Sequence, residues 1–155
     1  MPNIPTSNNT EDWQKYYAME CNNRAWSLST EIRSPKQDAE MLDAAHASAF
    51  HWGELGTELN RMRAVMLLAE VHSLLNLGAT AYAYAEEMLA YFKSVDSPDW
   101  ELAFAYCIYA HAASIAGPEA EYKGAYENAV LALEEIEDPE DQKIVQETFN
   151  HVPKP

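Results

Sequence analysis

The sequence contains few glycines, few cysteines and few basic residues, and each shortage argues against a class of protein. Five glycines among 155 residues leave little material for the glycine-rich loops that hold phosphate groups. The two cysteines, Cys21 and Cys107, form no CxxC pair, so the sequence predicts neither a disulfide framework nor a zinc finger. The chain does not start with a basic segment followed by an apolar run, and we therefore expect reduced thiols and a cytoplasmic location.

The shortage of basic residues gives the chain a net charge of −15, from 25 acidic residues and 10 lysines and arginines. Between Ala64 and Gln142, fifteen acidic residues accompany only two basic ones, Lys93 and Lys123. Such a surface repels nucleic-acid phosphates and anionic lipids, so we expect neither a nucleic acid nor a membrane as a partner. The charge is compatible with a basic protein partner, and also with an acidic surface that only keeps the protein in solution.

Strand-like alternation of apolar and polar residues is absent as well, and the remaining patterns indicate helices. Helix starts are marked by capping residues, three of them followed by proline, at Thr10, Ser34-Pro35, Thr57, Ser97-Pro98 and Asp138-Pro139. Helix ends are marked at Gly53, Gly56, 76–78 and 116–118. These signals predict seven helices, over residues 11–33, 36–51, 57–77, 79–94, 98–116, 119–136 and 139–150.

The short connections between these helices mean that successive helices are antiparallel. The third and fifth are apolar on nearly every side, which predicts that they lie in the centre. We expect an all-α fold of about seven antiparallel helices stacked as helix pairs, with an up-and-down helical bundle as the alternative. Residues 11–150 are predicted to form a single domain, with a flexible tail over 1–10 and a C-terminal tail over 151–155.

Residues 64–98 and 103–139 can be aligned with each other, which indicates an internal repeat. His72 and His111 occupy equivalent positions, and each lies six residues before a glycine. The offset is 39 residues at these histidines and 41 in the helix that follows. Helical hairpins that recur at such a period are typical of helical-repeat proteins.

Small residues and a closing turn in these units resemble those of the tetratricopeptide repeat. They are Ala113, Ala125, Ala129, Ala132 and Asp138-Pro139. Leu89 and Phe92 depart from the pattern, which has smaller residues there, and both units are longer than the usual repeat. Gly117 and residues 138–141 are also similar to the C-terminal pattern of small uncharacterised bacterial proteins of this type. The likeness covers about residues 57–150 as two repeat-like units, and it implies stacked helix pairs and protein–protein binding but no chemistry.

Three histidines inside predicted helices, His46, His72 and His111, suggest an alternative function. If the helices bring them together, they could form a metal site or a small-molecule site in a helical bundle. Cys107 and His111 are four residues apart, a spacing that places two ligands on one helical face. No helix carries two histidines at metal-ligand spacing, however, and a single histidine on an apolar helix is usually a core residue with a hydrogen-bond partner. Both interpretations stay open, and no resident cofactor is expected.

Trp52 and Trp100 lie at the ends of predicted helices, next to His51 and Glu101 respectively. A tryptophan beside a groove is a common binding anchor, although it often packs a helix end against its neighbour. Arginines are scarce here, and the pair that opens the third helix, at positions 61 and 63, could bind an anionic group or the protein's own acids.

No GxSxG motif, phosphate loop or activated nucleophile supports catalysis. The preferred hypothesis is a non-enzymatic module that binds a protein or peptide, of basic or mixed charge, in a groove between its helices. A homodimer is also compatible with the sequence, because short repeat arrays expose their end faces. The candidate binding residues are His46, His51, Trp52, His72, Trp100, Glu101 and His111.

Overall fold

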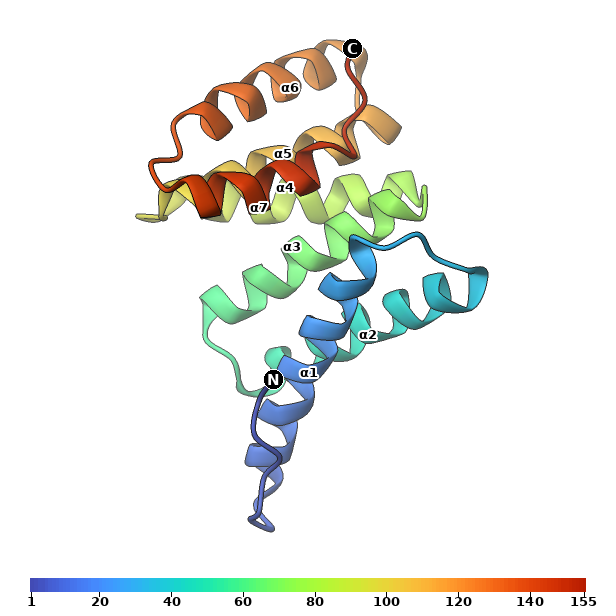
Figure 1. Ribbon diagram of the computed structural model, residues 1–155, viewed down its shortest axis with the longest axis vertical. Coiled ribbons are helices and arrows are strands. Elements are labelled where there is room, and N and C mark those ends of the chain that lie inside the picture. Colours follow the sequence, from blue (N-terminus) through green and yellow to red (C-terminus); the bar gives the residue numbers. More distant parts are fainter.

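The computed structural model describes all 155 residues and contains seven α-helices and no strand (Figure 1). The helices are α1 (Thr10–Ser29), α2 (Pro35–Leu55), α3 (Glu58–Leu74), α4 (Gly78–Ser94), α5 (Asp99–Ala116), α6 (Glu119–Glu134) and α7 (Pro139–Phe149). The predicted all-α fold of seven helices is therefore confirmed. None of the seven combines the length and the apolar character that crossing a bilayer requires.

Three predicted helix starts are confirmed, and each has a side-chain cap. The Ser34 hydroxyl accepts the backbone N–H of Gln37, whose side chain accepts the N–H of Ser34 in return. Thr57 forms the same reciprocal pair with the third residue of α3. The Asp138 carboxylate accepts two N–H groups of the first turn of α7. These caps satisfy N–H groups that have no partner within the helix.

Three predicted boundary signals are wrong. Thr10 does not cap α1 but is its first residue; the cap is Asn9, whose side chain accepts the N–H of Glu11 at 3.2 Å. Ser97 does not cap α5; its hydroxyl donates to the carbonyl of Phe92 at 2.9 Å, so it completes the end of α4 instead. Gly53 does not end α2, which continues to Leu55 because the next turn stays hydrogen-bonded up to Gly56.

α1 and α3 end at residues 29 and 74, well before the predicted 33 and 77, and local hydrogen bonds explain both ends. α1 stops at Ser29 because the Arg33 side chain donates to its last carbonyls, at 2.8 Å from that of Leu28. After α3, Asn76 adopts a left-handed conformation with φ of 57°, and the N–H of Leu77 returns to the carbonyl of His72 at 2.8 Å. This pattern is a Schellman motif, which ends a helix by turning the chain.

The helices stack as antiparallel pairs in two layers. α1, α3, α5 and α7 form one layer, in which each helix contacts the next. The even-numbered helices contact only their neighbours along the chain and not one another. The arrangement is that of stacked helix pairs, with α7 as a single helix at the end.

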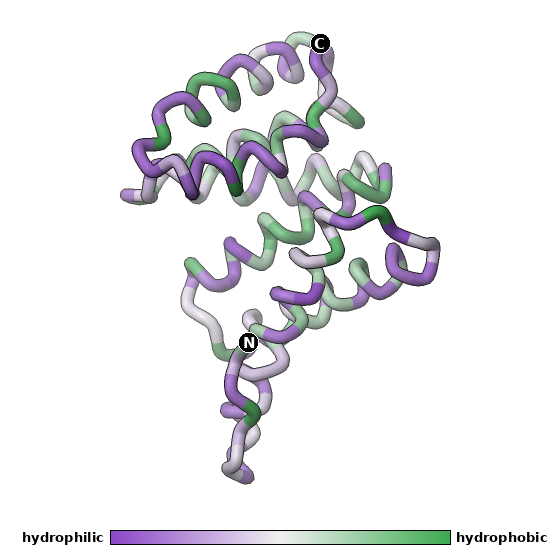
Figure 2. The backbone as a smooth tube through the Cα atoms, viewed as in Figure 1, coloured by the Kyte–Doolittle hydropathy of each residue, from purple (hydrophilic) through white to green (hydrophobic).

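Three apolar clusters fill the spaces between successive pairs, and α3 and α5 contribute to them on several sides. Both helices are buried over much of their length, as predicted, whereas α7 is mostly hydrophilic (Figure 2). Alanine is frequent in all three clusters, and its small side chain allows the helix backbones to approach closely.

Both terminal segments pack against helices. The indole N–H of Trp13 donates to the carbonyl of Ser7 at 3.0 Å, so the N-terminal segment folds back beside α1. At the other end, Val152 is buried and the Tyr122 hydroxyl donates to the carbonyl of Pro153. The last residues therefore lie against α6, where Figure 1 places the C-terminus.

Candidate functional site

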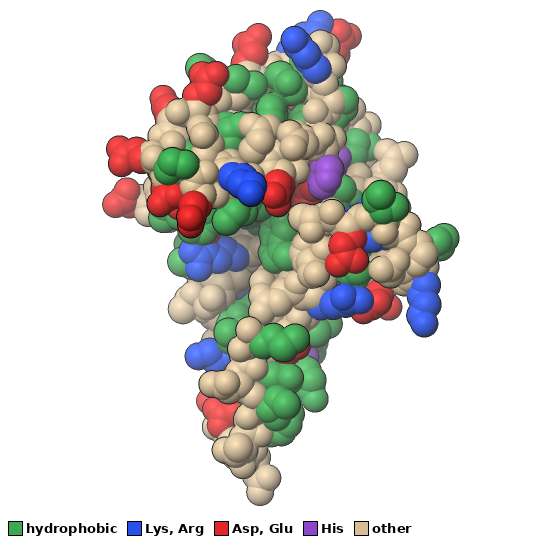
Figure 3. Space-filling model, viewed as in Figure 1, with side chains coloured by type: hydrophobic (Ala, Val, Ile, Leu, Met, Phe, Trp, Pro, Cys, Tyr) green, Lys and Arg blue, Asp and Glu red, His purple; other side chains and the backbone are tan.

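A groove crosses the layer formed by α1, α3, α5 and α7, which we call the inner layer, and all four helices contribute residues to its lining. Its volume is about 370 Å³, which is at the lower end of the range for ligand sites. The lining residues are Asn22, Trp26, Arg63, Met66, Trp100, Glu101, Phe104 and Ile144. In Figure 3 the surface recedes between α7 and α1, and acidic side chains gather over α6 and α7. The groove is therefore a mostly apolar hollow with acidic surface beside it.

Aromatic side chains form much of the groove. Trp26 of α1 and Phe104 of α5 meet edge to face, with ring centroids 5.3 Å apart and planes at 77°. This geometry is favourable for aromatic rings, and it joins helices that are not paired along the chain. Trp100 lies beside them, and Ile144 of α7 is 57% exposed although it is apolar. The groove thus offers rings and an aliphatic side chain that a ligand could cover.

One ion pair lies within this apolar surface. The Arg63 side chain donates twice to Glu101, from Nε to Oε1 at 2.5 Å and from Nη2 to Oε2 at 3.1 Å. Glu101 is 3% exposed whereas the Arg63 side chain is 44% exposed. The hydrogen bond to Glu101 raises the pKa of Arg63, which stays charged. Because Nη1 of Arg63 donates to no protein group, its N–H groups are free for a ligand.

A buried carboxylate lies one helical turn beyond Met66 on α3. Glu70 is 1% exposed, and its two oxygens bind different histidines. Nδ1 of His111 lies 3.1 Å from Oε2, and Nδ1 of His151 lies 3.3 Å from Oε1. Burial alone would raise the pKa of Glu70, but the hydrogen bonds from the two histidines outweigh it and lower this pKa. An ionised carboxylate inside the protein is thus held by α5 and by the segment after α7.

The hydrogen bond to Glu70 raises the pKa of His151 above its ordinary value, against a smaller opposing effect of burial and of Arg33. Cys107 lies near the same carboxylate, and burial raises the pKa of its thiol to about 12. Since the thiolate is the nucleophilic form, Cys107 is an inert core residue.

The three predicted metal ligands do not form one site. His46 and His72 lie edge to face, with ring centroids 5.2 Å apart, and Tyr84 packs against His72. His111 is bound to Glu70 instead. His72 Nδ1 bonds the carbonyl of Leu68 at 2.7 Å, and burial lowers its pKa. The structure contains no group of three or more His, Cys, Asp or Glu side chains that could hold a metal ion.

Two other predicted residues, His51 and Trp52, lie at the end of α2 and not in the groove. The His51 ring stacks on Tyr17 with centroids 6.2 Å apart, and its buried Nδ1 has no hydrogen-bond partner. The carbonyl of Trp52 accepts the N–H of Gly56, the residue that follows α2. Of the predicted anchors, only Trp100 and Glu101 line the groove.

Several residues of the groove and of the buried cluster were not predicted. Trp26, Met66, Phe104 and Ile144 looked like ordinary apolar residues of helices. Glu70 carried a usable signal, because it is the one charged residue in the apolar run from Ala64 to Leu77.

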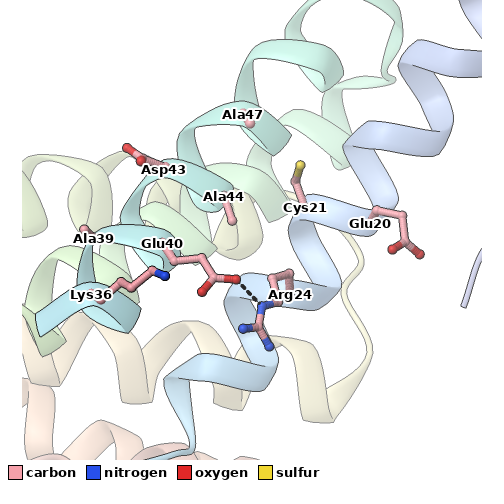
Figure 4. Close-up of a pocket in the computed structure, with 9 residues that line it drawn as sticks. All are labelled: Glu20, Cys21, Arg24, Lys36, Ala39, Glu40, Asp43, Ala44 and Ala47. Carbon is pink, nitrogen blue, oxygen red and sulfur yellow. Dashed lines mark hydrogen bonds and ion pairs between the residues drawn. The ribbon is translucent and has the colours of Figure 1, made fainter. Parts of the chain in front are cut away.

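A second depression lies on the outer side of α1 and α2 (Figure 4). Alanines 39, 44 and 47 line it together with charged side chains of both signs. Arg24 and Glu40 pair across it at 2.6 Å, with both side chains nearly half exposed. Since this surface is open and its charges are exposed to water, it offers weaker support for a binding site than the groove.

No family model, no curated protein and no solved structure matches this chain.

Proposed function

We propose that the protein is a non-enzymatic interaction module that binds a protein or peptide segment in the groove of its inner helix layer. The observation that carries this proposal is the meeting of four odd-numbered helices around one aromatic hollow. The resemblance to the tetratricopeptide repeat supports the same function. The arrangement in stacked pairs agrees with that resemblance.

The chemistry of the groove indicates the kind of segment that fits. Its volume of about 370 Å³ is enough for one or two large side chains. Trp26, Phe104 and Ile144 favour an apolar side chain, and aromatic surfaces of this kind often dominate binding energy. The acidic side chains over α6 and α7 favour lysine or arginine next to that anchor. We therefore propose an apolar anchor with basic flanking residues.

A panel of synthetic peptides tests this function. Each peptide carries one Trp, Phe or Leu between lysines, and its counterpart carries the same residue between glutamates. We expect saturable binding of the lysine series in fluorescence anisotropy, weakened by added salt, and much weaker binding of the glutamate series. Equal binding of both series would contradict the electrostatic part of the proposal.

A matched pair of variants locates the binding surface. Ile144→Ser alters an exposed apolar residue in the groove, and Leu131→Ser alters one of similar exposure on α6, outside it. We expect Ile144→Ser to weaken peptide binding by about tenfold and Leu131→Ser to leave it unchanged. Equal effects of the two substitutions would exclude the groove as the binding site.

Self-association remains a prediction of the sequence. We propose that a dimer would use the depression on α1 and α2 shown in Figure 4. The exposed charges there are of both signs, in a chain that is strongly acidic elsewhere. Sedimentation equilibrium of the native chain and of Ala44→Glu would detect a dimer that uses this face.

A further inference from the structure

The C-terminal segment makes a direct contact between the end of the helix stack and α3, which are otherwise connected through α5. α7 packs against α5 and α6 but makes no helix contact with α3. His151, two residues beyond the end of α7, contacts Glu70 of α3 through its Nδ1. α7 also supplies Ile144 to the groove, whose floor includes Met66 of α3. The position of this groove wall relative to its floor therefore depends in part on the contact between His151 and Glu70.

We propose that protonated His151 and Glu70 form a latch that holds α7 in place as a wall of the groove, and that loss of the proton from His151 releases this wall. The inference rests on the proposed binding function for its purpose, but the latch itself is a property of the unliganded protein.

The latch is electrostatic because Glu70 has almost no contact with water. An ionised carboxylate at 1% exposure is costly unless charged or polar partners compensate it. The His151 side chain is 33% exposed, so it can exchange its proton with solvent while the fold stays intact. The contact thus joins a carboxylate that water hardly reaches, that of Glu70, to an imidazole that can exchange its proton with solvent, that of His151.

The other charged and titratable groups around this contact are identifiable. His111 of α5 binds the second oxygen of Glu70, and Cys107 of α5 stays protonated, with a pKa of about 12. Arg33, between α1 and α2, lies near His151 and lowers its pKa, but its own side chain is bound to Asp38 and to backbone carbonyls. Protonation of His151 therefore adds the positive charge that holds the C-terminal segment on Glu70.

The direction of the pH effect follows from the two shifted groups. Because Glu70 raises the pKa of His151, the latch is closed at and below the ordinary histidine range and opens as the pH rises through the raised value. Because the pKa of Glu70 is lowered, acid breaks the latch only below the ordinary carboxylate range. The segment is anchored to α5, α6 and α7, since Val152 packs into the apolar cluster that these three helices share and Pro153 binds Tyr122, so it shifts with them relative to α3.

A distance measurement across the groove tests the latch without any ligand. Asn23→Cys in α1 and Lys143→Cys in α7 place spin labels at exposed positions, in a background with Cys21→Ser; Cys107 is buried. We expect double electron–electron resonance to give a narrow distance distribution at roughly pH 6 and a longer, broader one at roughly pH 9. The same distribution at both pH values would overturn the proposal.

Three further variants test the charge of His151 specifically. We expect His151→Gln to give the broad distribution at both pH values, and His151→Lys to restore the narrow one at both. His46→Gln changes an exposed histidine outside the cluster and should leave the native transition intact. A pH transition that survives in His151→Gln, or a broad distribution in His151→Lys, would show that the charge of His151 is not the cause. Since no peptide is present, failure of the latch leaves the groove proposal standing, and absence of peptide binding leaves the latch standing.

Discussion

His72 of α3 and His111 of α5 occupy equivalent positions 39 residues apart, but the two side chains have different partners. His72 Nδ1 bonds a carbonyl of its own helix, that of Leu68, and the ring packs against His46. His111 Nδ1 bonds the buried carboxylate of Glu70, on the preceding inner helix. α3 thus supplies an acid to α5, whereas the ring that packs against His72 is a histidine of α2.

The comparison shows that side chains at positions aligned in the sequence differ in their chemistry. In the second unit the residue equivalent to Glu70 is Tyr109, whose hydroxyl lies 3.2 Å from that of Tyr82. The hydrogen-bond partner of His72 thus comes from its own helix and that of His111 from α3, and we expect the two sites to respond differently to substitution and to pH.

Removing the carboxylate should have the largest effect. Glu70→Ala leaves both His111 and His151 without their acceptor and opens a cavity in the inner layer. We expect a loss of about 3 kcal/mol in the free energy of unfolding, measured by urea denaturation. Tyr109→Phe, at the equivalent position of the other unit, should cost about 1 kcal/mol or less. Similar losses for the two variants would mean that the buried ion pairs add little to stability.

A matched pair of truncations isolates the partners of the two histidines. His72→Ala and His111→Ala remove the same atoms from similarly buried sites, so their cavity costs largely cancel in the comparison. We expect His111→Ala to cost about 1 kcal/mol more, because a hydrogen bond to a charged group is stronger than one to a carbonyl. Equal losses in urea denaturation would contradict a special role for Glu70.

The smallest expected effect is on the pH dependence of the free energy of unfolding, which His151 and His72 change in opposite directions. The raised pKa of His151 gives stability that is complete below the ordinary histidine pKa and is lost as the pH rises through the raised value. The lowered pKa of His72 gives stability that is complete above the ordinary value and falls as the pH drops below it.

Urea denaturation from roughly pH 5 to pH 9 would detect both slopes. His151→Gln should flatten the alkaline side of the stability profile, and His72→Gln should flatten the acid side. If both variants flatten the same side, the assignment of the two histidines is wrong.

Local signals predicted the secondary structure well, because a cap and its helix lie within a few residues of each other. Ser34, Thr57 and Asp138 all cap the helices they were expected to cap. Ser97 was misassigned because its hydroxyl can bond backward to α4 as easily as forward to α5, and only the fold decides between the two.

The site was harder to predict, because it depends on how the helices rotate against one another. Trp26 and Phe104 meet across α1 and α5, and no spacing in the sequence marks that contact. His151 belongs to a segment that was predicted to be a tail, and its partner becomes evident only when that segment is placed beside α3. The repeat alignment pairs His72 with His111, but it carries no information about Glu70 as the acceptor that His111 shares with His151.

The contact between His151 and Glu70 also has a consequence for the order of folding. Close approaches of the helix backbones elsewhere in the chain join immediate neighbours or next neighbours, and such short-range topologies fold rapidly from many starting points. The hydrogen bond from His151 to Glu70 joins residues 81 positions apart, so its loop closes only after the helices between them have assembled. We expect this bond to form last during refolding and to be among the first to open, so that Glu70 becomes solvated before the core of the protein unfolds.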